Sequence, residues 1–342
     1  MYLVNLDWLE LLFQMDHPEM LINPQDVYIK NSTLSLVKTT DLRFFNQYKN
    51  PFDIFIDDRK VGHLFKDPVI NPLYRKNNII SVWFDNQVLY DTDTTSILET
   101  LLEGLKLSFY GISRIDICVD TDEDIQNRFK EMYNDIENFS MKYRNPNGTN
   151  SNQFINGTGK FDKRTEIGSL KNRKRMIVFY DKSLELEKGN KPYISKLHQE
   201  IFRHKQVERI ELRLFRKEFS RNKELYIDIY KLNDKNYLEG IFKHFFDEMI
   251  DFRRINKSDS CKSRYERIDL IKLNETSEVL KKPLIIEDVH NNSYTKYLVK
   301  TLHNDSKKDE FKKQRKEMIE LRDRYIKEFG LEDYFTKKLS NG

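Results

Sequence analysis

The sequence predicts an α+β protein, with a mostly antiparallel sheet, helices packed on one face of it, and a helical carboxy-terminal region. The first hundred residues hold short β-rich runs broken by Asn, Asp and Pro, which is typical of a meander of strands. Further along, β-type runs are followed by amphipathic helical runs. The mean hydropathy of −0.73 is low, but 13% of the residues are aromatic, which is enough to build a folded core.

The positions of the apolar residues predict the individual elements. In the first half of the chain we expect strands at 54–56, 79–84 and 88–90, a helix at 94–107, a strand at 112–120 and a helix at 125–139. In the second half we expect two strands, 165–167 and 175–182, on either side of a basic turn, then a helix at 194–205, a strand at 207–215 and a helix at 237–252.

A polar break at residues 257–262 sets the predicted domain boundary near residue 256. Residues 1–256 form the first domain, with two β-rich lobes, and residues 257–342 form a mainly helical region. Within that region the apolar residues of 307–329 recur at helical intervals beside a basic flank. This pattern predicts a role in DNA recognition or in dimerisation.

The net charge of +4 is distributed unevenly along the chain. Residues 142–219 contain 19 Lys and Arg against 9 Asp and Glu, so this segment carries +10 and the remainder carries −6. Such asymmetry is typical of a surface that binds a polyanion, because each phosphate contact releases counterions. A Lys-rich surface without such a role explains the charge equally well.

Composition argues against several classes of protein. No stretch approaches the roughly 18 apolar residues of a membrane span, and residues 1–13 carry Asp7 and Glu10 where a signal peptide would be basic. We therefore expect a soluble protein that is not exported and has no membrane partner. The two cysteines, Cys118 and Cys261, agree with a cytoplasmic location. Zinc spacings among the seven histidines, a Walker loop and a G-x-S-x-G elbow are all missing.

Carboxylates and arginines alternate with aliphatic residues in two predicted strands. In the segment 114–120 the side chains of Asp116 and Asp120 share one face, and Glu211 lies between two arginines in the segment 207–215. Buried carboxylates are costly unless they are paired or hold a cation. If the two strands are neighbours, these three acids converge on a site for Mg²⁺ or Mn²⁺. Alternatively, each acid pairs with an adjacent arginine.

The segment 176–182 supplies the candidate nucleophile. Tyr180 and Lys182 share one face of this predicted strand, and a cation beside a phenol lowers the cost of forming the phenolate. Lys182 is also placed to neutralise a phosphate under attack. The alternative is an amphipathic aromatic residue at a sheet edge, and composition does not choose among the 18 tyrosines.

Three segments in this order resemble a known family. They are RIDICVD (114–120), TEIGSLKNRKRMIVFYDKSLELE (165–187) and VERIELRLF (207–215). The order is similar to that in the replication initiators of staphylococcal rolling-circle plasmids, which are related to phage replication initiation proteins and conjugative-element relaxases. The resemblance covers about residues 1–250.

The resemblance implies an enzyme that nicks and rejoins one DNA strand at an origin through a 5′-phosphotyrosyl intermediate, with a divalent metal. Tyr180 matches the nucleophile of the family, and Lys182 would stabilise charge. Asp116 and Glu211, with Asp120 or Glu185, would hold Mg²⁺ or Mn²⁺. The DNA-contacting residues predicted in and beside the basic window are Lys171, Arg173, Lys174, Arg175, Arg209 and Arg213.

The expected partners are single-stranded or cruciform origin DNA, a second copy of the chain in a homodimer, and a host helicase. Two other functions fit the same residues. One is a DNA-binding regulator that keeps the sheet but lacks catalysis. The other is a metal-dependent nuclease in which water attacks and Tyr180 is structural.

Overall fold

The computed structural model describes residues 1–21, 27–29, 32–41, 48–68, 78–91, 94–135, 137–144, 150–151, 164–168, 174–189, 191–221, 225–255 and 265–273. The chain divides into two compact units, Met1–Lys282 and Pro283–Gly342. Strand β14 (Tyr265–Ile268) and the buried residues Leu270 and Ile271 belong to the first unit, which therefore extends beyond the boundary predicted near residue 256. The helix predicted at 307–329 lies outside the described residues.

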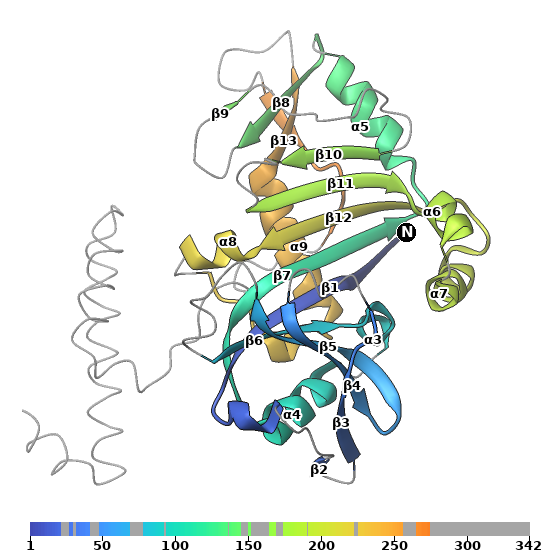
Figure 1. Ribbon diagram of the computed structural model, residues 1–342. Coiled ribbons are helices and arrows are strands. Elements are labelled where there is room, and N and C mark those ends of the chain that lie inside the picture. The colour runs from blue at the N-terminus through green and yellow to red at the C-terminus, as the bar shows by residue number, and fades with distance from the viewer. Residues whose placement is uncertain are drawn as a thin grey trace, which may run out of the picture. The chain divides into compact units, whose positions relative to one another are not determined.

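The predicted α+β class and antiparallel sheet are confirmed. A ten-stranded sheet has the order β10-β11-β12-β7-β1-β6-β5-β4-β3-β2, and every pair in it is antiparallel (Figure 1). Its strands are β1 (Tyr2–Met15), β2 (Val27–Ile29), β3 (Ser32–Lys38), β4 (Tyr48–Ile56), β5 (Arg59–Pro68), β6 (Ile79–Phe84), β7 (Leu107–Thr121), β10 (Arg164–Gly168), β11 (Arg175–Asp181) and β12 (Glu208–Phe215). A smaller sheet has the order β14-β13-β8-β9, with β8 (Phe139–Arg144), β9 (Asn150–Ser151) and β13 (Ile250–Ile255).

The helices connect these strands. They are α3 (Asn86–Tyr90), α4 (Thr94–Gly104), α5 (Ile125–Asn134), α6 (Lys182–Lys188), α7 (Pro192–Phe202), α8 (Arg216–Arg221) and α9 (Lys235–Met249), with 3-10 turns η1 (Pro18–Leu21) and η2 (Ile229–Lys231). The strand predicted at 88–90 is wrong, because these residues form the end of α3 and bury Val88 and Leu89. The helix predicted at 237–252 ends at Met249, and the apolar run continues as buried residues of β13.

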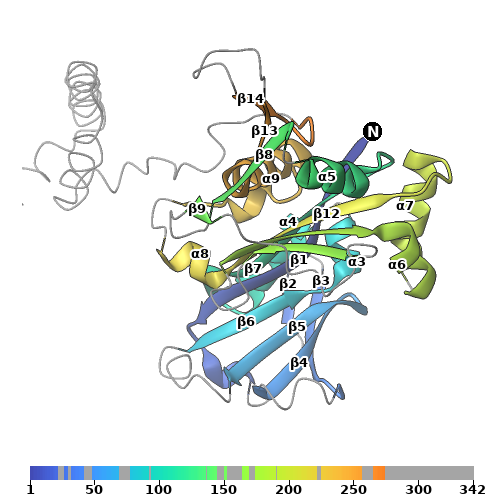
Figure 2. The same ribbon diagram turned by 90° about the horizontal axis from the view of Figure 1, so that it is seen from above.

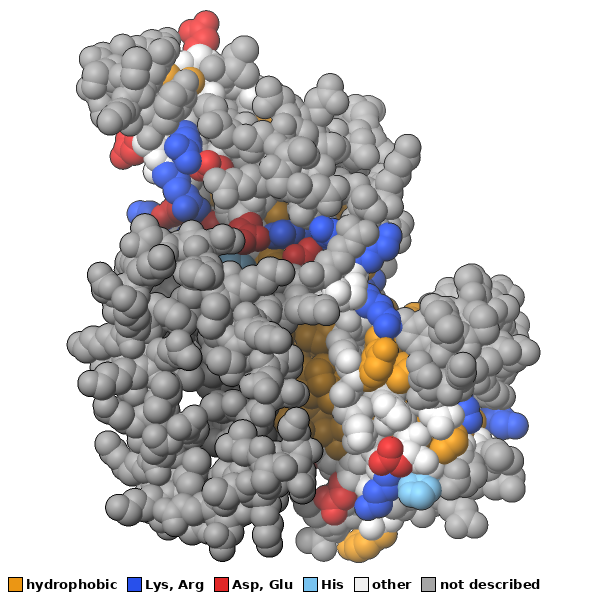
Figure 3. Space-filling model, turned by 90° about the vertical axis from the view of Figure 1, so that its left-hand side faces the viewer, with side chains coloured by type: hydrophobic (Ala, Val, Ile, Leu, Met, Phe, Trp, Pro, Cys, Tyr) orange, Lys and Arg blue, Asp and Glu red, His pale blue; other side chains and the backbone are white. Residues whose placement is uncertain are grey.

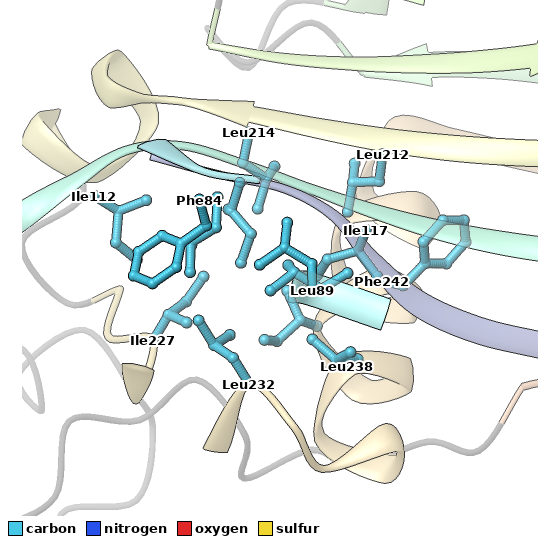
Figure 4. Packing of buried hydrophobic residues seen from close by; sticks show 14 of the residues in the cluster. Phe84, Leu89, Ile112, Ile117, Leu212, Leu214, Ile227, Leu232, Leu238 and Phe242 are labelled. Atoms are coloured by element: carbon cyan, nitrogen blue, oxygen red, sulfur yellow. The ribbon is translucent and has the colours of Figure 1, made fainter. Parts of the chain in front are cut away.

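One face of the sheet is apolar and carries α5 and α9 (Figure 2). The ring of Phe129 in α5 lies 4.8 Å from that of Phe179 in β11, and Phe179 also contacts Phe246 of α9. Figure 4 shows the same core continuing below β7 and β12, where Ile117 and Leu212 lie near Phe242 of α9. Because strands alternate their sides, the polar residues next to these positions face the other way.

Strand β7 lies between β12 and β1, and all its residues from Ile115 to Thr121 are buried. A carboxylate on this strand is therefore held away from bulk water, whichever face it occupies. None of the helices within the described ranges is long and apolar enough to cross a bilayer.

Candidate functional site

Three rows of cross-strand neighbours build the site on the polar face of β11, β12 and β7. The strands are paired in the register Tyr180–Arg209–Asp120, then Val178–Glu211–Cys118, then Met176–Arg213–Asp116. The sequence-based condition that the segments 114–120 and 207–215 are neighbours is therefore met. The same register places the predicted nucleophile and the acids on one face of the sheet.

Tyr180 contacts one of the predicted acids directly. Its hydroxyl donates a hydrogen bond to Glu211 Oε2 at 3.2 Å, and its side chain remains partly exposed. Burial raises the pKa of the phenol well above its usual value, and the nearby Glu211 carboxylate raises it further, whereas the Arg209 charge opposes both. A neutral phenol with a carboxylate acceptor is therefore the resting arrangement, and a nucleophile needs a base to remove its proton.

Asp116 and Glu211 are joined through arginines. Arg213 Nε lies 2.7 Å from Glu211 Oε1 and 3.8 Å from Asp116 Oδ2, while Arg114 binds Asp116 with both Nε, at 2.9 Å, and Nη2. Burial raises the pKa of Asp116 to about 8, and the Glu211 charge adds to the rise although Arg114 opposes it. Asp116 and Glu211 therefore compete for the positive charge of Arg213. Active sites use neighbouring acids of this kind to set which carboxyl group carries a proton.

Asp120 lies in a separate, closed network. Arg209 Nε donates to Asp120 Oδ1 at 2.5 Å, Nη2 donates to Asp120 Oδ2 at 2.6 Å, and His198 Nε2 of α7 lies 2.8 Å from the same Oδ2. The network continues to Asp7 and Tyr90, which Arg209 contacts at 2.7 and 2.8 Å. Burial alone would raise the pKa of Asp120, but the Arg209 charge and hydrogen bonds outweigh it and lower the pKa.

This network corrects one sequence-based assignment. Arg209 was predicted to contact DNA, yet its side chain is completely buried and its donors bind Asp120, Asp7 and Tyr90. A guanidinium paired in this way holds the sheet and the helix together and does not reach a phosphate.

Asp7, Tyr90 and His198 are site residues that the sequence analysis did not find. Asp7 is the extra residue of a β-bulge, because the pairing of β1 with β7 shifts between Leu6 and Trp8. The bulge lets the Asp7 side chain reach Arg209, although a regular strand would alternate the faces of Leu6, Asp7 and Trp8. The helices α3 and α7 supply Tyr90 and His198, and no local pattern marks such long-range contacts.

Lys182 is completely buried at the start of α6. Its Nζ lies 5.6 Å from the centre of the Tyr180 ring and forms an ion pair with Glu185, whose side chain is exposed. Lys182 therefore stands beside the predicted nucleophile, as expected, but Glu185 is occupied by this pair and does not join Asp116 and Glu211. The structure thus divides the four predicted metal ligands among three places.

Metal binding stays a prediction that rests on Asp116 and Glu211. Within the described ranges, no group of three or more His, Cys, Asp or Glu side chains gathers closely enough to hold a metal ion. Mg²⁺ usually takes one or two protein carboxylates and completes its shell with water and substrate phosphate. The pair of buried acids fits that mode, and a site made of protein ligands alone does not fit.

The other predicted DNA contacts are spread over different surfaces. Lys171 and Arg173 lie outside the described residues, and Lys174 is partly exposed directly before β11. Arg175 points toward the helix face, where its Nη1 lies 2.5 Å from Glu248 and its guanidinium lies 5.2 Å from the Phe245 ring. Arg213 remains on the polar face beside the acids. On the side drawn in Figure 3, described basic and acidic side chains lie next to one another.

Neither known protein families nor curated proteins provide a match for this chain. The assignment of a function therefore rests on the residues and their geometry.

Proposed function

We propose that the chain is a replication initiator that nicks and rejoins one strand of DNA, with Tyr180 as the nucleophile. The observation that carries the proposal is the hydrogen bond from the hydroxyl of Tyr180, a partly exposed residue, to Glu211 at 3.2 Å, beside the buried acid Asp116. A nucleophile, a base and an arginine that reaches both acids occupy one face of adjacent strands. The order of the three segments in the rolling-circle initiators supports the same assignment.

The reaction is a transfer of a phosphodiester from a sugar to the tyrosine. Glu211 accepts the phenol proton while the Tyr180 oxygen attacks phosphorus, so that a bond from Tyr180 to phosphorus forms and the bond from phosphorus to the 3′ oxygen breaks. The departing 3′ oxygen takes up a proton from water, and Glu211 returns its proton to solvent. The protein is then linked to the 5′ phosphate, and attack by the 3′ hydroxyl reverses the step and rejoins the strand.

Positive charge around the phosphate comes from Arg213 and, at a longer distance, from the buried Lys182. Asp116 and Glu211 would hold the divalent ion, Mg²⁺ or Mn²⁺. Such an ion would supply further stabilisation of the charge that develops on the phosphate oxygens. The two carboxylate oxygens of Glu211 have different partners, because Oε2 faces Tyr180 and Oε1 faces Arg213.

The test is a covalent adduct. The full chain is incubated with Mn²⁺ and single-stranded oligonucleotides that tile its coding DNA and the flanks, and bands that survive denaturant are counted. We expect the wild type to form an adduct. In Tyr180→Phe the yield of adduct should fall by roughly a thousandfold or more, while DNA binding is retained. Tyr193→Phe is the matched control, because Tyr193 lies nearby on α7 and bonds Asn86 at 2.6 Å instead of an acid.

Other outcomes point to the two alternative functions. Cleavage without an adduct that survives in Tyr180→Phe would indicate a nuclease that uses water. Binding of DNA by the wild type without cleavage under any metal condition would indicate a non-catalytic regulator. An adduct that disappears in Tyr193→Phe and not in Tyr180→Phe would overturn the assignment of the nucleophile.

A further inference from the structure

A continuous row of rings crosses the polar face from the site to β5. The Arg114 guanidinium lies 5.5 Å from the Phe215 ring centre and 4.8 Å from that of Trp8. Trp8 lies 5.5 Å from Trp83, Trp83 lies 4.6 Å from Phe65, and Phe65 stacks on His63 at 5.9 Å. These six residues, here named the aromatic row, come from β12, β7, β1, β6 and β5.

The register of the sheet produces the row. Phe215 is paired with Arg114, Arg114 with Glu10, Glu10 with Trp83, and Trp83 with His63. The bulge at Asp7 places Trp8 beside this line, opposite Asp116. The row therefore passes through Arg114, the residue that binds Asp116, and from there leads away from Tyr180 across the strands.

The row remains open in part. Trp8, Trp83 and Phe215 are partly exposed, and the side chain of Arg114 is 26% exposed. Phe65 is only 1% exposed and packs edge-on against Trp83, so it supports the row and is not itself open to a base. The indole nitrogen of Trp83 donates to Ser81 at 3.1 Å, whereas that of Trp8 has no hydrogen-bond acceptor among the described residues. This differs from the centre of the Arg209 network, where Arg209, Asp120 and His198 are all buried. The Trp8 nitrogen atom is itself buried, so it offers no contact to a ligand on the surface of the row.

We propose that the aromatic row binds single-stranded DNA by stacking of its bases, on the path that leads to or from Tyr180. The direction of that path rests on the proposed function, whereas the stacking does not. Aromatic side chains on an open sheet and the plane of an arginine are the surfaces on which unpaired bases stack, with little dependence on sequence. Four strand spacings separate β11 from β6, which is about 19 Å, and this distance suits a run of several nucleotides.

The charges near the row favour bases over phosphates as the contacting groups. Glu10 accepts from Ser81 at 2.9 Å, and the Asp53 carboxylate lies 2.8 Å from His63 Nδ1. These acids offset the positive charges of Arg114 and Lys60. A polyanion without bases would therefore gain little here, whereas stacking does not need a positive surface.

The chain provides its own reporter for the test. Trp8 and Trp83 are the two tryptophans of the sequence, so all tryptophan fluorescence comes from the aromatic row. The full wild-type chain is titrated with an oligothymidylate and, separately, with heparin as a polyanion that lacks bases. We expect saturable quenching by the oligothymidylate and none by heparin.

Substitutions in the aromatic row test whether the oligothymidylate binds there. Trp83→Leu should weaken oligothymidylate binding about 5- to 150-fold, measured through the remaining Trp8, while Trp83→Phe should restore most of it because a ring is retained. Tyr28→Leu is the control, since Tyr28 is 71% exposed on β2 and lies outside the row. Equal affinity in Trp83→Leu, Trp83→Phe and wild type would overturn the proposal, and so would equal quenching by heparin.

The test separates this proposal from the proposed function. Tyr180→Phe should quench and bind as the wild type does, because the row lacks Tyr180. Quenching without an adduct would support base stacking on the aromatic row and overturn the proposed nicking reaction. An adduct at Tyr180 without quenching would support the nicking reaction and overturn the proposal that DNA bases stack on the aromatic row.

Discussion

Two Arg–Asp pairs join β12 to β7, and they differ in what surrounds them. Arg209 faces Asp120 and Arg213 faces Asp116, and the one pair between them on the same face of the sheet is Glu211 and Cys118. Asp120 and Arg209 are completely buried, and His198, Asp7 and Tyr90 complete their contacts. The other pair keeps Arg213 at 20% side-chain exposure, next to the partly exposed Tyr180.

The difference shows how the same residue types take different roles in one sheet. A closed, fully satisfied pair fixes the positions of strands and helices, and removing one partner leaves a buried charge. The open pair, beside the proposed nucleophile, leaves an acid with a raised pKa and an arginine that solvent can reach. Residue type alone does not distinguish a structural pair from a pair in a reactive site. Substitutions in the two pairs should distinguish them.

The largest effect on stability is expected for Asp120→Asn. The substitution leaves the buried Arg209 without its main carboxylate partner, so the free energy of unfolding should fall by about 3–5 kcal/mol. Urea denaturation followed by circular dichroism measures the change. A loss below about 1 kcal/mol would show that the network is not closed as described.

Asp116→Asn should not destabilise the protein as Asp120→Asn does, and it should stabilise the protein at high pH. Because burial raises the pKa of Asp116 to about 8, the folded protein holds a proton there that the unfolded chain releases near pH 4. The unfolding free energy contributed by this group is therefore present at low pH and lost as the pH rises toward 8. In metal-free buffer, Asp116→Asn should stay within about 1 kcal/mol of wild type near pH 5 and become the more stable of the two near pH 8.

Adduct formation completes the contrast between the two aspartates. Asp116→Asn should lower the rate of adduct formation by about a hundredfold, since in the proposed reaction charge develops beside this acid and its arginine partners. A folded Asp116→Asn variant with wild-type adduct rates would place Asp116 among the structural residues, together with Asp120.

The smallest effect is expected at Glu208, beside the closed pair. Burial raises the pKa of Glu208 to about 7, with Asp124 and Asp181 adding to the rise, while the hydrogen bond from the Gln126 backbone at 2.7 Å opposes it. Stability from this group is present below about pH 4.5 and lost as the pH approaches 7. Glu208→Gln should therefore be more stable than wild type at pH 8 by about 1 kcal/mol, after allowance for solvent exposure. A pH series of urea midpoints in both proteins measures this, and parallel curves would contradict it.

The sequence predicted the strands of the site but not their complete environment. Alternating residues in 114–120, 175–182 and 207–215 correctly placed Tyr180, Glu211 and Asp116 on shared faces, because a strand has a period of two. The same rule places Arg175 on the helix side with Phe179, although the basic turn suggested a DNA contact. A strict use of the alternation would have removed Arg175 from the predicted interface.

The rest of the site depends on contacts far apart in the sequence. The bulge that turns Asp7 and Trp8 toward the polar face, and the helix that brings His198 to Asp120, have no local signal. The apolar run from α9 into β13 likewise has no break in composition where the helix ends. Tertiary packing decides these features, so a single sequence cannot specify them.

The most direct measurement is the identity of the residue that carries the DNA. After adduct formation and digestion with nuclease and trypsin, the residue should be mapped by mass spectrometry. The account predicts a nucleotide on the peptide 176–182, which contains Tyr180 and no other hydroxyl side chain. A nucleotide on a peptide containing Tyr90 or Tyr193, or cleaved DNA with no modified peptide, would contradict it.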